Sequence, residues 1–117
     1  MKTILLLLVT MLTINLSAQD GGQSTTVNDT ITVSGNCGHC KERIENAALI
    51  KGVKFAEWNK ESHELVLIYK SDKVTLEEIE KSILKAGHDV GEKKGDDEAY
   101  KALPGCCQYK TGGTCTH

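Results

Sequence analysis

Two cysteines separated by two residues are the first part of this sequence that could do chemistry. Cys37 and Cys40 enclose Gly38 and His39, and Gly35 lies just before them. Two thiolates form a soft ligand pair that suits Cu(I), and also Zn(II) or Hg(II), far better than Mg(II) or Ca(II). At the start of a helix, the unsatisfied amides of the first turn favour thiolate over thiol. The same spacing is compatible with a structural disulfide or with a redox-active pair.

Three further cysteines lie near the C-terminus, at positions 106, 107 and 115. Cys106 and Cys107 are candidate metal ligands, because a closing strand of about five residues followed by a short helix would bring the tail back to the Cys37 loop. The alternative is a tail disulfide in which one of them pairs with Cys115. A bridge between the two adjacent cysteines would be strained.

The composition limits the classes of function. The chain has 117 residues, of which 39% are apolar and 26% are charged, with a formal net charge of −2. These values are typical of one small globular domain and are too polar for a membrane bundle. The sequence has no cluster of basic residues that could bind a phosphate backbone, so nucleic acid is not expected as a partner.

The first eighteen residues are predicted to be a signal peptide. Lys2 precedes an apolar run from Ile4 to Ile14, and Ala18 supplies a small residue before a cleavage point. The run is shorter than the roughly 20 residues of a membrane span, so no membrane insertion is expected after cleavage. We therefore predict a periplasmic or secreted protein, in a compartment that permits disulfides. Residues 19–29 are predicted to be a flexible leader.

The region from 30 to 91 contains alternating strand and helix patterns. A capping box at Thr75 and Glu78 marks the start of the second helix. The order predicts an α+β fold of the split βαβ type, with a four-stranded antiparallel sheet and two helices on one face. The expected elements are a strand from Thr30, a helix over 40–51, a hairpin formed by 53–58 and 64–69, a helix from Thr75 to about Gly87, and a closing strand at 88–90.

A family resemblance rests on three stretches of the chain. Residues 35–45 (GNCGHCKERIE), the Gly52-Val53 pair and the Ala86-Gly87-His88 run resemble the heavy-metal-associated domain. That family includes copper chaperones, modules of copper-exporting ATPases and the periplasmic mercuric-ion-binding protein. The resemblance implies a ferredoxin-like βαββαβ fold over 30–91, one soft metal ion held between the motif cysteines, and a metal donor or acceptor such as a copper-transporting ATPase as partner.

The chain departs from the family at two positions and in its tail. The family usually has a methionine beneath the metal loop where this chain has Gly35, so a looser loop is expected. His88 stands where the family often has tyrosine or phenylalanine. Because the last strand should begin beside the end of the first, His88 is a further candidate for metal contact or for tuning the thiols. Residues 92–117 are a cysteine-containing extension, in which 96–103 are predicted to be helical.

Three functions are compatible with these features. The leading one is a non-enzymatic metallochaperone or scavenger that holds Cu(I) or a similar ion and transfers it by thiolate ligand exchange. A thiol-disulfide oxidoreductase is the alternative, since Cys-Gly-His-Cys is also a motif of disulfide isomerases. A thioredoxin-like fold would need more strands and helices and a proline-bearing loop, and Pro104 is the only proline. The third is a structural disulfide domain that binds a protein partner.

Overall fold

The computed structural model of the protein describes residues 25–111. The predicted signal peptide, the first part of the predicted leader and Cys115 lie outside the described residues. Within the described part, no helix has both the length and the apolar character needed to cross a membrane.

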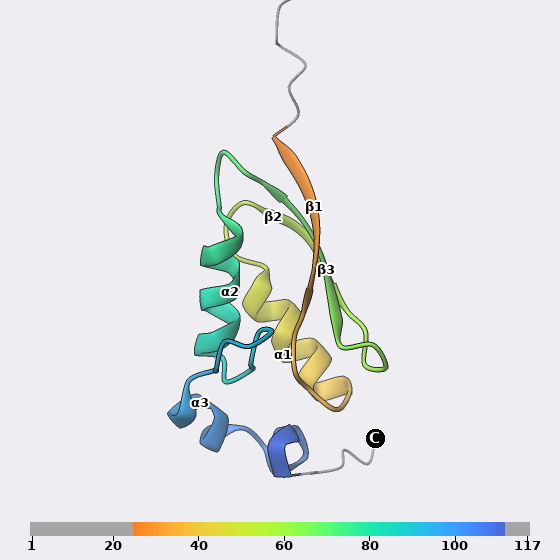
Figure 1. Cartoon of the computed structure of the whole chain (residues 1–117), viewed down its shortest axis with the longest axis vertical. Coiled ribbons are helices and arrows are strands. Elements are labelled where there is room, and N and C mark those ends of the chain that lie inside the picture. Colours follow the sequence, from red (N-terminus) through yellow and green to blue (C-terminus); the bar gives the residue numbers. More distant parts are fainter. Residues whose placement is uncertain (1–24, 112–117) are drawn as a thin grey trace, which may run out of the picture.

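A three-stranded antiparallel sheet forms the centre of the fold, with strand order β1-β3-β2. Helices α1 and α2 lie on one face of this sheet (Figure 1). The predicted helix–hairpin–helix succession and the covering of one face are confirmed. The elements are β1 (Thr26–Thr32), α1 (Gly38–Ala48), β2 (Val53–Trp58), β3 (Glu64–Lys70) and α2 (Leu76–Lys85).

Alternation of apolar side chains explains why only one face of the sheet is covered. In β3, Leu65, Leu67 and Tyr69 are buried, while the residues between them are more exposed. Apolar residues of α1 and α2 at helical spacing meet this face, so that burial of apolar surface holds the two layers together. The fully buried aliphatic members of this core are Val33, Ile44, Ala48, Leu65, Leu67, Ile79 and Ile83.

The start of α2 has the predicted capping box. The Thr75 side chain accepts a hydrogen bond from the Glu78 backbone N–H (3.1 Å), and the Glu78 carboxylate accepts one from the Thr75 N–H (2.9 Å). These contacts satisfy two amides that have no partner inside the helix. The sequence pattern therefore located this helix end correctly.

Strand β1 begins at Thr26 rather than at Thr30, so the end of the predicted leader is ordered. Thr26 is opposite Lys70 in the antiparallel register, and the Lys70 ammonium donates to its hydroxyl. Tyr69 donates a hydrogen bond of 2.6 Å to Asp29. This bond, together with burial and the charge of Asp29, raises the pKa of Tyr69 to about 12. The polar residues at the start of β1 adopt strand conformation because they pair with β3. The local sequence does not reveal these partners.

The predicted fourth strand is wrong for the described structure. Val90 makes a single antiparallel bridge to Val33 and then pairs with Lys93. The chain turns between these two residues at Gly91, where φ is 55°. This early turn leaves one bridge instead of a strand. The predicted neighbourhood is nevertheless correct, because residues 88–90 lie beside the end of β1.

The C-terminal extension folds back toward the start of α1. It consists of α3 (Asp97–Ala102) and two short 3-10 turns, η2 (Gly105–Cys107) and η3 (Tyr109–Thr111). In Figure 1 the blue tail lies at the same end of the molecule as the first turn of α1. Leu103 is buried in the core. The predicted helix over 96–103 is confirmed, with Asp96 as its N-cap.

Candidate metal centre

The N-terminus of α1 positions the two motif cysteines. Cys37 is the N-cap residue in extended conformation, and Lys41 N–H donates to its carbonyl at 3.0 Å. Cys40 therefore lies in the first helical turn, with its side chain on the buried face of α1. The first amides of a helix have no intrahelical acceptor and carry partial positive charge. Such an environment stabilises thiolates and hence favours soft-metal binding.

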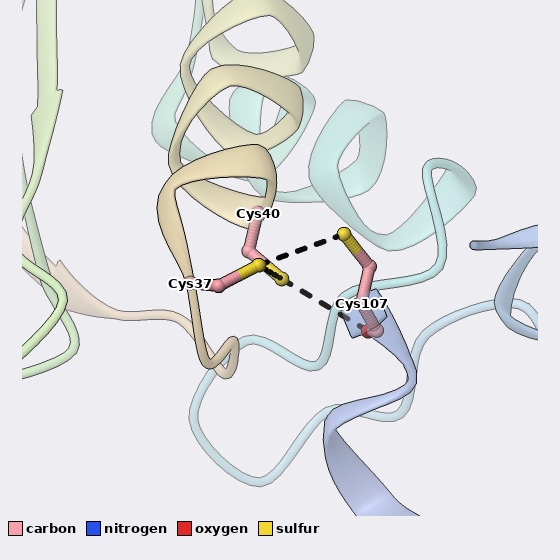
Figure 2. A group of neighbouring side chains, drawn as sticks. All are labelled: Cys37, Cys40 and Cys107. Carbon is pink, nitrogen blue, oxygen red and sulfur yellow. Dashed lines mark hydrogen bonds between the residues drawn. The ribbon is translucent and has the colours of Figure 1, made fainter. Parts of the chain in front are cut away.

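A third cysteine from the tail joins this pair. The Sγ of Cys37 lies 3.8 Å from the Sγ of Cys40 and 3.9 Å from the Sγ of Cys107. All three sulfur atoms lie within 4.8 Å of one another, and all three residues are buried. Figure 2 shows Cys107 pointing toward the motif cysteines from the opposite side. Within residues 25–111 this is the one such group of potential metal ligands.

The disulfide state differs among the cysteines. Cys37 is disulfide-bonded, whereas Cys40, Cys106 and Cys107 are not. A tail disulfide through Cys106 or Cys107 is therefore not present in this structure. Metal binding requires deprotonated thiolates, so Cys37 must be reduced before it can act as a ligand.

Hydrogen bonding and burial control the two buried free thiols. The Cys40 thiol donates to the side-chain oxygen of Asn36 at 3.1 Å. Burial, reinforced by contacts with Cys40 and Cys106, raises the pKa of the Cys107 thiol to about 12. Cys107 is thus protonated near neutral pH and gives up a proton when it binds metal. Sequence reasoning missed Asn36, although an amide next to the first cysteine of the loop was a usable signal.

The indole of Trp58 fills the space beneath the metal loop. A Cβ atom added at Gly35 would lie 3.0 Å from two ring carbons of Trp58 and 3.0 Å from the Cβ of Cys40. The Trp58 ring also donates from Nε1 to the carbonyl of Val33 at 2.9 Å. The indole therefore occupies the position beside the glycine, and the expectation of a looser loop at Gly35 stays a prediction.

His88 is fully buried beside the same loop. Its Nδ1 lies 2.8 Å from the carbonyl oxygen of Ser34, and since a carbonyl can only accept, Nδ1 carries the proton. Its Nε2 is buried and lacks a hydrogen-bond partner in the described structure. Burial is the largest influence on this ring and lowers its pKa. His88 does not belong to the three-sulfur group, so its direct contact with metal stays a prediction.

The structure separates the two adjacent tail cysteines. Cys107 is fully buried, whereas Cys106 is only partly buried. The Sγ of Cys106 lies 4.0 Å from that of Cys107, while its carbonyl oxygen is 3.8 Å from the Sγ of Cys37. Of the predicted candidates, Cys37, Cys40 and Cys107 are thus brought together, and Cys106 is their neighbour.

Curated relatives of the chain are copper chaperones. A copper chaperone CopZ of Staphylococcus epidermidis is 37% identical over 62 residues, which cover 51% of this chain and 91% of that protein. A copper chaperone CopZ of Staphylococcus haemolyticus is 32% identical over 66 residues, covering 55% of this chain and 97% of that protein.

Solved structures and a family model agree with this match. A CopZ metallochaperone structure superposes with a TM-score of 0.54 at 33% identity, covering 56% of this chain and all of that one. The oxidized MerP of Ralstonia metallidurans, at 22% identity, has a similar fold, with a TM-score of 0.53 over 56% of this chain and 94% of its own. Residues 29–89 match the model of the heavy-metal-associated domain. The chain therefore belongs to the heavy-metal-associated domain family.

Proposed function

We propose that this protein is an exported, non-enzymatic carrier of a soft metal ion, which it holds between Cys37 and Cys40 and passes on by thiolate ligand exchange. The observation that carries this proposal is the approach of the two sulfur atoms to 3.8 Å at the N-terminus of α1. Two soft ligands and a locally positive helix end suit a soft cation.

Cu(I) is the ion that we propose as the cargo. The relatives are named copper chaperones, and membership of the family supports metal binding by this domain. Thiolate pairs also bind Zn(II) and Hg(II), so these ions are the competitors that a selectivity measurement must include. The comparisons give no support to the alternative of a thiol-disulfide oxidoreductase.

Ligand exchange accounts for transfer without free metal. An acceptor thiolate binds the ion while one of the two cysteines still holds it, and the second cysteine then leaves. Cys37 is 5% exposed and Cys40 is fully buried. Cys37 is therefore the sulfur that an acceptor reaches first, and Cys40 is the ligand that leaves last.

Export and the partner belong to the same proposal. The predicted signal peptide over 1–18 places the protein in the periplasm or outside the cell. There a metal donor or acceptor protein, such as a copper-transporting ATPase, would exchange the ion with it. Expression in a bacterial host followed by mass measurement of the exported protein tests this step, with a mature chain beginning at Gln19 as the expected product.

A transfer experiment tests the carrier function. The reduced protein is loaded with Cu(I) and mixed with an excess of an apo metal-binding module from a copper-exporting ATPase, and the copper on each protein is measured over time. We expect transfer that is faster than release of Cu(I) to a chelator that cannot contact the protein. Transfer limited by spontaneous release would contradict the ligand-exchange mechanism. Insulin reduction catalysed by the protein would favour the oxidoreductase instead.

A further inference from the structure

We propose that Cys107 supplies a third thiolate, so that this chain holds Cu(I) in a closed, three-sulfur site. The inference rests on the function proposed above and adds a ligand from outside the heavy-metal-associated domain. It also changes the expected behaviour of the protein, because an ion with three ligands is retained more firmly than an ion with two.

The sulfur spacings match three-coordination better than a linear pair. With metal–sulfur bonds of about 2.3 Å, two sulfurs in line across an ion lie about 4.6 Å apart, whereas three in a trigonal plane lie about 4.0 Å apart. The Sγ of Cys37 lies 3.8 Å from that of Cys40 and 3.9 Å from that of Cys107. Once Cys37 is reduced, an ion could bind among the three sulfurs with little movement of the loop or the tail.

Packing of the tail, rather than chance, brings Cys107 to this place. The Tyr109 hydroxyl accepts a hydrogen bond from Asp89 N–H (2.9 Å) and donates one to the carbonyl of Gly87 (3.1 Å). The Tyr109 ring also stacks on His88 with centroids 5.5 Å apart. Leu103, on the other side of Cys107 in the chain, is buried in the core. Anchors on both sides therefore hold this cysteine against the loop.

Close packing of backbone against backbone adds a further anchor. A Cβ atom at Gly87 would lie 2.7 Å from the backbone nitrogen of Tyr100, and one at Gly95 would lie 2.9 Å from the carbonyl carbon of Gly87. The end of α2 and the start of the extension thus approach each other more closely than other residues allow. This contact fixes where α3 begins, and with it the path of the tail to Cys107.

Binding by three thiols has a defined balance of charge and protons. Each thiol gives its proton to solvent when it binds Cu(I), and no electron is transferred. The complex then carries two net negative charges, which the partial positive charge at the N-terminus of α1 offsets in part. Because Cys107 covers the loop from the tail side, the tail must move away before an acceptor can replace all three sulfurs.

Adjacent cysteines provide a matched pair of variants for the test. Cys107→Ser removes the buried sulfur, and Cys106→Ser removes a partly buried sulfur one residue away that does not belong to the three-sulfur group. Both variants and the unchanged chain are reduced with a phosphine under anaerobic conditions. Cu(I) affinity is measured by competition with a chromophoric chelator, and coordination number by X-ray absorption at the copper edge. Circular dichroism checks that each variant is folded.

The expected result is three-coordinate Cu(I) in the unchanged protein and in Cys106→Ser, and two-coordinate Cu(I) in Cys107→Ser with affinity reduced by about tenfold or more. Two-coordinate Cu(I) in the unchanged protein, with equal affinity in all three proteins, would overturn the inference and leave the two-cysteine carrier intact. Failure of the unchanged, reduced protein to bind Cu(I) would instead overturn the proposed function itself. The absorption spectrum of the unchanged protein decides the question even if a variant does not fold.

Discussion

Single residues around the metal loop decide how firmly its cysteines are held. Gly35 is in contact with the Trp58 ring, and a Cβ atom there would also approach Cys40 to 3.0 Å. The glycine and the indole therefore form a complementary pair. Together they provide packing beneath the loop, at the place where the family usually has a methionine side chain.

We predict that Gly35→Ala lowers the free energy of unfolding by about 1–3 kcal/mol, because the added methyl group overpacks the loop. Gly38→Ala is the matched control, since a Cβ atom there meets nothing within 4 Å. In a helix the control should be neutral or slightly stabilising. Denaturant unfolding of both variants checks this. Equal stability of the two variants would show that the space beside Trp58 is not tightly filled.

His88 is predicted to hold the backbone just before the cysteines. In His88→Phe the donor to the Ser34 carbonyl is lost, so the unfolding free energy should fall by about 1–3 kcal/mol. The loosened loop should also exchange Cu(I) faster. His88→Asn retains an N–H donor and should recover part of both losses. Stopped-flow exchange and denaturant unfolding measure the two effects. Identical values for His88→Phe and the unchanged protein would show that the His88 ring only fills space.

The cysteine-containing extension is an integral element of the fold rather than an appendage. Its last 3-10 turn places the Tyr109 hydroxyl against the backbone of Asp89 and Gly87. The predicted fourth strand, residues 88–90, does not pair along β1. It makes one bridge, from Val90 to Val33, and the tail contacts it through Tyr109. The extension thus stabilises a segment that the three-stranded sheet leaves incompletely paired.

Removal of one hydroxyl tests the docking of this element. Tyr109→Phe should lower the unfolding free energy by about 1–3 kcal/mol, because it leaves the buried Asp89 N–H without an acceptor. In the control, Tyr100→Phe, the lost contact is an exposed hydrogen bond from Lys110 N–H, so a change within about 0.5 kcal/mol is expected. Thermal and denaturant unfolding compare the two. An equal or larger loss in the control would contradict the role given to Tyr109.

At the scale of the whole molecule, acid should weaken the fold. Burial lowers the pKa of His88 below its usual 6.5, so the folded protein disfavours the charged ring. For a group with a lowered pKa, the stabilising contribution is present above the unfolded pKa and is lost as pH falls through the folded pKa.

Protonation of Asp89 causes a further loss of folding stability at lower pH. Burial tends to raise its pKa, but the hydrogen bond from Gly95 N–H, the charges of Lys110 and Lys94, and the Tyr109 hydroxyl together hold it below 3.8. Unfolding free energy measured from pH 7.5 downward should therefore decline first below about 6.5 and again below about 4. His88→Asn should remove the first decline. A flat profile between pH 7.5 and 5 would contradict the buried neutral state of His88.

The sequence predicted the parts of this molecule that local patterns determine. The capping box of α2, the β2–β3 hairpin and the strand-to-helix placement of Cys37 and Cys40 follow from local periodicity and spacing. The turn at Gly91 and the pairing of Thr26 with β3 depend on distant partners, so local patterns did not reveal them. Chain length predicted the return of the tail, but the choice of Cys107 over Cys106 depends on how Tyr109 and Leu103 dock.

Replacement of both motif cysteines tests directly whether Cys37 and Cys40 hold the ion. The Cu(I) affinity of the reduced protein is compared with that of a Cys37→Ser/Cys40→Ser variant. His39→Ala, which changes an exposed side chain between the two cysteines, is the control. Competition titration should give one Cu(I) per chain for the unchanged protein and for the control, with affinity lowered by about a thousandfold or more in the double variant. Tight Cu(I) binding that survives replacement of both cysteines would show that Cys37 and Cys40 do not form the metal site.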